Sequence, residues 1–231
     1  IEEARRLAVE YAEKARADLQ VFERSPYREA LAYLPDFILA RDMLARIYLN
    51  KGDYAKALKE AEGAIALNQN DLPARLSRSS ALMGIGDSQK ARQELDSVLA
   101  IAPNNPDARY QAGYLAWSEK DYKRARQVFD DLYKSNPKDS RGLIGLIETM
   151  ASENRMADAI KLLQDSVARD PERRDYRMAL ANLYVRDQRY DDAVKLLQEL
   201  LKTEPKSADL LLRLAETQRR TGLHPSQPGP A

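Results

Sequence analysis

The stretch Gly52-Asp53-Tyr54, which is followed by Ala57, decides the fold because related stretches return at a constant interval. An alanine stands at the same place in every copy, and these alanines lie 34 residues apart: Ala57, Ala91, Ala125, Ala159 and Ala193. Prolines keep the same spacing at four positions: Pro103, Pro137, Pro171 and Pro205. Two residue types that hold one register over so many copies indicate an internal structural repeat.

The period divides most of the chain into five complete units. They span residues 38–71, 72–105, 106–139, 140–173 and 174–207. Each unit is predicted to form two helices; in the third, Pro106 suits the first turn of one helix and Tyr122 begins the other. A single hairpin of helices cannot bury its apolar face alone, so stacked neighbours are expected to share a core. The sequence therefore predicts an all-α fold, an alpha-alpha superhelix of antiparallel helix pairs.

The two ends depart from this pattern. Residues 1–37 read as a degenerate repeat in which Pro26 interrupts the second helix, so we predict capping helices over about 2–23 and 27–33. After residue 207 only a first helix is left, at 208–221, and it is predicted to cap the other end. The last stretch, 222–231, is rich in proline and glycine and is predicted to be a disordered tail.

Small residues at fixed points predict where neighbouring helices approach each other closely. The second helices carry the alanines named above. The first helices carry a small residue at the eighth position of the unit: Ala45, Ser79, Gly113, Ala181 and Ala215. Ile147 takes this place in the fourth unit, so its hairpin is expected to pack slightly differently.

Composition excludes several classes of function. Lys plus Arg number 37 and Asp plus Glu 36, so the net charge of +1 provides no general field for attracting nucleic acid. The chain has no cysteine, and its one histidine, His224, lies in the proline-rich tail. Thiolate nucleophiles, zinc–cysteine sites and histidine-based triads are therefore not expected. No apolar run is long enough for a membrane helix.

Two further features of composition concern the compartment and the extent of the chain. A cysteine-free chain is compatible with reducing and oxidising compartments alike. The chain begins at Ile1 rather than at methionine, so we expect a processed or excised piece of a longer protein.

Beyond the period, the residue types resemble the tetratricopeptide repeat signature. In the first unit the matching residues are Leu44, Ala45, Tyr48, Gly52, Tyr54, Ala57 and Ala64. Later matches are Gly113, Tyr122, Ala125, Phe129, Pro137, Leu180, Ala181, Tyr184, Tyr190, Ala193 and Pro205. The resemblance implies a right-handed solenoid that binds other proteins and is not an enzyme. It covers residues 38–221, and one departure recurs: the fourth position, often a large apolar residue in the family, holds Arg41, Arg75, Arg109 and Arg177. We expect their stems to cover apolar surface and their heads to reach water.

The resemblance also implies that the first helices line a concave face, with the second, fifth, ninth and twelfth residues of each unit toward a ligand. The candidate peptide-binding residues are Leu76, Ser80, Met83, Tyr110, Tyr114, Trp117, Arg141, Ile144, Glu148, Met178 and Asn182. The middle of this face is apolar and aromatic, whereas its ends carry charge, as at Asp42 and Arg219. Aromatic anchors are typical of the centre of a protein interface. Leu76, Ile144 and Met178 suit core packing and ligand contact equally well.

These features lead to one main functional hypothesis and two alternatives. The main hypothesis is a non-catalytic module that binds a peptide or protein segment in its concave groove, with no cofactor, metal or nucleic acid. Adjacent carboxylates such as Asp130 and Asp131 point about 100° apart on a helix, so they predict no metal site. The alternatives are an assembly scaffold or self-associating spacer, and the regulatory segment of a larger enzyme.

Overall fold

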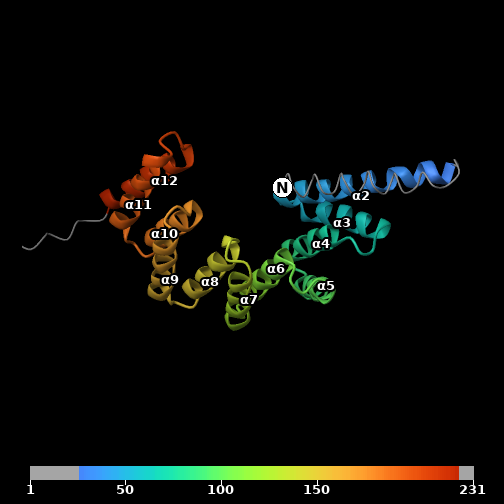
Figure 1. Cartoon of the computed structure of the whole chain (residues 1–231), viewed down its shortest axis with the longest axis horizontal. Helices are drawn as coiled ribbons and strands as arrows, with labels where there is room; N and C mark the ends of the chain where they lie inside the picture. Colours follow the sequence, from blue (N-terminus) through green and yellow to red (C-terminus); the bar gives the residue numbers. More distant parts are fainter. Residues whose placement is uncertain (1–25, 224–231) are drawn as a thin grey trace, which may run out of the picture. The chain divides into compact units, whose positions relative to one another are not determined.

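The computed structural model describes residues 26–223, and over that range the chain forms eleven helices and no strand (Figure 1). The predicted all-α fold of repeated helices is confirmed. The chain divides between Leu115 and Ala116 into two compact units. Each unit is described separately below.

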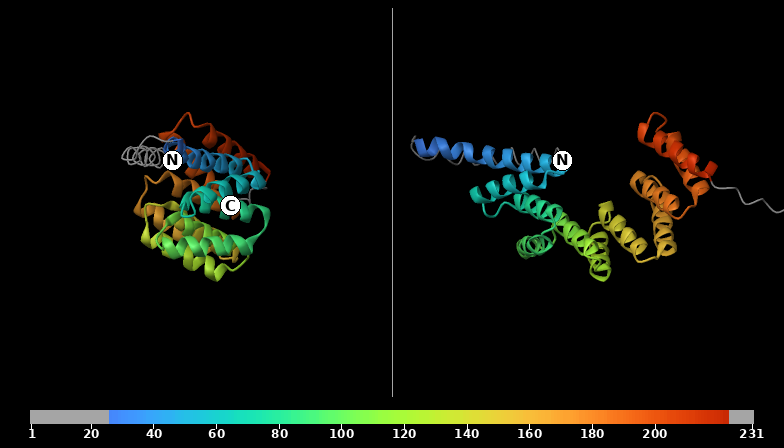
Figure 2. Two further views of the ribbon diagram at one scale, coloured as in Figure 1. Left: turned by 90° about the vertical axis from the view of Figure 1, so that its right-hand side faces the viewer. Right: turned by 180° about the vertical axis from the view of Figure 1, so that it is seen from behind.

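The first unit contains four complete helices and most of a fifth. They are α2 (Pro26–Asn50), α3 (Tyr54–Leu67), α4 (Leu72–Ile85), α5 (Ser88–Ile101) and α6 (Pro106–Ser118), the last of which crosses the division. Helix α2 packs against α3, α3 against α4, and α4 against α5. Figure 2 shows α2, the longest helix, lying along α3.

The second unit continues the same succession of helices. They are α7 (Tyr122–Ser135), α8 (Ser140–Ser152), α9 (Met156–Arg169), α10 (Arg174–Arg186), α11 (Tyr190–Thr203) and α12 (Ala208–Leu223). Each helix packs against the next, and α8 also contacts α10. The exact limits of the repeats within 38–207 stay a proposal.

One backbone turn recurs between the two helices of each pair. The residue at its centre has a positive φ in all five copies: Gly52, Gly86, Lys120, Asn154 and Gln188. These positions are again 34 residues apart. A left-handed residue allows the chain to leave a helix and turn back, and glycine adopts it without steric cost. Lys120 and Gln188 adopt the same conformation at φ 64° and 61° despite their side chains.

Aspartates begin several of the helices by capping their first turn. Asp53, Asp87 and Asp121 each accept a hydrogen bond from the backbone N–H three residues later. Asp71 caps α4 in the same way, through the N–H of Ala74 at 3.0 Å. These bonds satisfy N–H groups that have no partner within the helix.

The core is distributed along the seams between neighbouring helices. In the first unit, Leu82, Leu95 and Val98 are buried together with apolar residues of α6. In the second, one cluster surrounds Leu143 and Leu163, and another surrounds Leu197 and Leu200. This arrangement is expected for a repeat protein, in which each hairpin buries its apolar face against the next.

Close helix contacts occur where small residues were predicted. All five alanines of the second helices, Ala57, Ala91, Ala125, Ala159 and Ala193, are fully buried. Ile147 is buried as well, in the same cluster as Leu163. Ala215 differs, because it is exposed. Ala215 lies on α12, which no further helix follows within 26–223.

The arginines at the fourth position do more than the sequence predicted. Arg41 and Arg75 form ion pairs with Glu60 and Glu94 on the second helix of their own pair, at 2.9 and 2.8 Å. Arg177 pairs with Glu199 across α10 and α11 at 3.4 Å. Carboxylates on the facing helix therefore hold these three guanidinium groups, although each side chain keeps some exposure to water.

The prediction for the N-terminal region requires one correction. The short helix expected over 27–33 is not separate, because α2 runs without a break from Pro26 to Asn50. Pro26 begins the helix, where its missing N–H costs nothing. Pro35 removes only one hydrogen bond from a helix of 25 residues. The helix expected over 2–23 and the tail from 224 onward lie outside the described residues, and α12 continues to Leu223, two residues past its expected end.

Candidate functional site

A hollow of about 280 Å³ opens on the first unit, between helices α3, α4 and α6. Its lining contains four of the predicted ligand-binding residues: Ser80, Met83, Tyr110 and Tyr114. Tyr54, Gly84 and Gln111, which were not predicted, complete the lining. None of the seven lining residues carries a charge.

Tyr54 reaches the hollow because of the turn that precedes it. Gly52 turns the chain at φ +73°, Asp53 caps the helix, and Tyr54 is the first residue of α3. Its ring lies against Gly84 of α4, where a β-carbon would come within 2.3 Å of Tyr54 Cδ1. The absence of a side chain at position 84 therefore allows the ring to lie where it does.

Helix α6 provides a further part of the lining and is joined to α4 by a polar contact. Ser79, which is fully buried on α4, donates a hydrogen bond from its hydroxyl to the side-chain carbonyl of Gln111 on α6. Tyr110 and Tyr114 lie on α6 one turn apart, so their side chains share a face of that helix. Tyr114 is 45% exposed and Tyr110 is half-buried. The hollow thus has two aromatic walls, one from α3 and one from α6.

Asp42 is a charged member of the predicted face in the first unit. It lies on α2 with only 8% of its surface exposed. Its Oδ1 has no hydrogen-bond donor among the described residues. Burial, followed by the nearby charge of Asp71, raises the pKa of Asp42 to about 7, while Arg46 acts in the opposite direction. Its carboxyl group therefore titrates near neutral pH.

In the second unit three of the predicted residues are bound by side chains outside the predicted set. Trp117 donates its indole N–H to the hydroxyl of Ser152 at 3.0 Å. Glu148 on α8 forms an ion pair with Arg186 on α10. Asn182 accepts a hydrogen bond from Arg213 of α12 at 3.0 Å. These side chains are held by partners within the chain.

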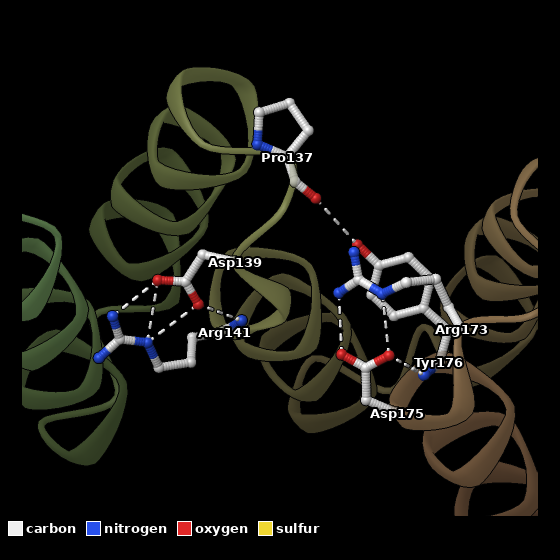
Figure 3. A network of polar contacts seen from close by, with 6 residues as sticks. All are labelled: Pro137, Asp139, Arg141, Arg173, Asp175 and Tyr176. Atoms are coloured by element: carbon white, nitrogen blue, oxygen red, sulfur yellow. Dashed lines mark hydrogen bonds and ion pairs between the residues drawn. The ribbon is translucent and has the colours of Figure 1, made fainter. Parts of the chain in front are cut away.

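A polar network lies around the starts of α8 and α10 (Figure 3). Arg141, another predicted ligand-binding residue, grips Asp139 with contacts of 2.6 to 3.0 Å, and this lowers the pKa of Asp139. Arg173 likewise lowers the pKa of Asp175 through two hydrogen bonds. The Arg173 guanidinium also lies 4.2 Å from the centre of the Tyr176 ring.

Tyr176 ties this network to the preceding loop. Its hydroxyl donates to the carbonyl of Pro137 at 3.4 Å, and burial raises the pKa of the phenol. Figure 3 shows Arg141 directed at the carboxylate of Asp139 and Arg173 directed at that of Asp175. Such charge-assisted, bidentate pairs order the loops, so this network has a structural explanation.

The apolar candidate residues at the fifth position of the repeat units have different surroundings. Leu76 is 9% exposed and belongs to the core cluster of the first unit. Met178 packs against the cluster around Leu197, and Ile144 is half-buried. Leu76 and Met178 therefore support the packing of helices.

The period that organises these sites also identifies the family. Tetratricopeptide repeat models match residues 43–106, 116–183 and 174–217. The chain is a tetratricopeptide repeat protein. This family is generally a non-catalytic fold that mediates interactions between proteins, so the chain is a protein-interaction or scaffold module.

Solved structures of other tetratricopeptide repeat proteins share the fold. A thermophilic protein of Thermus thermophilus is 20% identical, with a TM-score of 0.62 over 78% of this chain and 98% of its own. A tetratricopeptide repeat protein from Parabacteroides merdae is 18% identical, with a TM-score of 0.63 over 93% of this chain and 80% of its own. MamA from Desulfovibrio magneticus is 24% identical, with a TM-score of 0.53 over 75% and 98%. Comparison with curated proteins found no match.

Two further properties of the described part concern other partners of this tetratricopeptide repeat protein. Between residues 26 and 223, every helix is too short or too polar to cross a lipid bilayer. The same range holds no cluster of three or more acidic or histidine side chains arranged to bind a metal ion.

Proposed function

We propose that the protein binds an extended segment of a partner protein on the face of the first unit formed by α4 and α6. The observation that carries this proposal is the hollow lined by Tyr54, Tyr110 and Tyr114. Tyrosine provides a large apolar surface together with a polar edge. This combination suits a surface that is hydrated in the free protein and loses its water when a ligand binds. Few residues dominate the energy of most interfaces, and tyrosine is enriched among them.

The contrast with the second unit supports this location. There Glu148 and Asn182 are already paired with Arg186 and Arg213. A ligand would have to replace that ion pair and that hydrogen bond, whereas the lining of the hollow in the first unit carries no charge. Binding there requires no buried charge to lose its partner.

The test compares the wild-type chain with the Tyr110→Ala/Tyr114→Ala double variant. Both are used as bait for partners, and segments of any captured protein are then titrated calorimetrically against both. We expect the double variant to lose at least tenfold in affinity while circular dichroism shows intact helices. Tyr190→Ala is the matched control, because Tyr190 begins α11 as Tyr54 begins α3 but lies outside the hollow. Equal affinity of the wild-type and double-variant proteins would disprove this binding face.

Exposed apolar side chains on α2 and α12 favour a second candidate function, assembly with further copies of the chain. Leu44 and Ile47 on α2 and Leu211 on α12 are each more than two-fifths exposed. Such surface is costly to leave in water and is common at protein contacts. Sedimentation over a range of concentrations tests this candidate: association that Ile47→Asp and Leu211→Asp abolish would support it, and a monomer at all concentrations would exclude it.

A further inference from the structure

The hollow of the first unit restricts the chemistry of its ligand by what its lining does not contain. Its side chains are three tyrosines, a serine, a methionine and a glutamine, beside Gly84. An anionic ligand group that entered would lose water without gaining an opposite charge, which is unfavourable. The lining therefore disfavours anions and suits an uncharged part of a ligand.

The aromatic walls further restrict its shape. Tyr54 comes from α3, and Tyr110 and Tyr114 come from α6, so rings face the hollow from two sides. Aromatic-lined grooves are a recurrent means of binding proline-rich segments, whose rings pack flat against the aromatic faces. Such segments hold the polyproline II conformation before they bind, so little conformational entropy is lost.

The hydrogen-bonding groups of the lining point to the same ligand. Proline has no backbone N–H, and a polyproline II helix leaves its carbonyl oxygens without internal donors. It therefore needs donors from the protein. Gln111 contacts Ser79 through its side-chain amide, and because the amide nitrogen carries two hydrogens, this contact leaves at least one N–H to donate. Ser80 adds a hydroxyl to the same lining.

We infer that the hollow takes an uncharged, proline-rich segment of a partner protein in the polyproline II conformation. This inference rests on the proposed function and specifies its ligand. The rings of Tyr54, Tyr110 and Tyr114 pack against the proline rings. Gln111 and Ser80 donate to carbonyl groups of the segment.

Titration of the full chain with a blocked peptide of about ten prolines tests the inference. A glycine–serine peptide of equal length, equally uncharged but without rings, is the control ligand. We expect saturable binding of the proline peptide alone. We expect a loss of roughly tenfold or more in Tyr54→Ala and in Tyr114→Ala, and no change in Tyr190→Ala. Nuclear magnetic resonance of the labelled protein should show shifts confined to α3, α4 and α6.

A displayed library of random peptides separates failure of this inference from failure of the proposed function. Selected peptides without proline that need Tyr114 for binding would overturn the proline assignment and leave the binding face in place. If the proline peptide binds no better than the glycine–serine peptide and no selected peptide depends on Tyr114, both proposals are wrong. Equal losses in Tyr190→Ala and Tyr114→Ala would also overturn the inference, because the effect would not come from the hollow.

Discussion

The ring of Tyr54 lies against the backbone of Gly84, so that a β-carbon at position 84 would approach Tyr54 Cδ1 to 2.3 Å. The two residues belong to α3 and α4 and form one corner of the hollow. Because Tyr54 is 37% exposed, its side chain can rotate away from a larger neighbour.

Gly84→Ala is therefore expected to change ligand binding more than stability. The new methyl group displaces the Tyr54 ring and reshapes the hollow, while alanine favours the helix by about 0.5–1 kcal/mol over glycine. We expect a melting temperature within a few degrees of wild type and weaker binding of the ligand. Thermal denaturation and calorimetric titration measure the two effects. A large loss of stability would show that Tyr54 cannot move.

Gly142→Ala is expected to have the opposite balance. A β-carbon there would meet the backbone of α7, at 2.5 Å from the nitrogen and 2.8 Å from the Cα of Tyr133. Backbone cannot rotate away as a side chain does, so the helices must separate. We expect a loss of about 1–3 kcal/mol in the free energy of unfolding. Urea denaturation measures it, and a neutral result would contradict the close contact between α7 and α8.

Ser152→Ala tests the hydrogen bond from Trp117. The substitution leaves the indole N–H without the hydroxyl that accepts from it at 3.0 Å. We expect a loss of about 1 kcal/mol and a shift in tryptophan fluorescence, which reports on one residue because the chain has a single tryptophan. Ser97→Ala is the control, since that serine bonds only the carbonyl of Gln93 on an exposed surface. Identical emission spectra for wild type and Ser152→Ala would be inconsistent with this contact.

Asp42→Asn is expected to stabilise the protein above neutral pH. The pKa of Asp42 is raised from 3.8 to about 7 in the folded chain. The folded state therefore keeps a proton that the unfolded state releases, and the free energy of unfolding falls as the pH rises through this window. Asparagine is neutral throughout and avoids the loss.

The gain from Asp42→Asn should grow between about pH 4 and pH 7, stay level above that, and reach a few kcal/mol at most. Chemical denaturation at pH 5 and pH 8 measures the difference, with the exposed Asp165→Asn as control. The same gain at both pH values would contradict the raised pKa.

The left-handed turn residues predict a series of stabilising substitutions. Lys120→Gly and Gln188→Gly relieve a conformation that costs a residue with a β-carbon roughly 1 kcal/mol. The net gain is expected to be about 0.5 kcal/mol, because glycine also loses more entropy on folding. Asn154→Gly should gain less, since asparagine tolerates this conformation. Denaturation midpoints should therefore rise more in Lys120→Gly and Gln188→Gly than in Asn154→Gly. Equal gains at all three positions would argue against the steric explanation.

The repeat was predictable because each of its requirements is local. The sequence shows directly a small residue at each expected helix contact and a turn every 34 residues. Ala57 and its equivalents are buried, as such contacts require. The end of the array was less predictable. A short helix was expected over 27–33, yet α2 continues past Pro35 to Asn50, because a long helix tolerates the loss of one hydrogen bond.

The candidate site was predictable only in part. Ser80, Met83, Tyr110 and Tyr114 were expected from their places on the first helices, and they line the hollow. Tyr54 was missed because it begins a second helix and reaches the hollow only through the gap left by Gly84. The pairing of Glu148 with Arg186 depends on long side chains that meet across two repeats, which residue spacing alone does not reveal.

The positive-φ residue that closes each first helix has a consequence for how such a chain can change its length. Because the same reversal stands at equivalent places from Gly52 to Gln188, a whole helical pair could be deleted or duplicated between two of these points without altering the local conformation at either junction. The length of the array and the number of repeats can then vary independently of the residues that recognise a ligand.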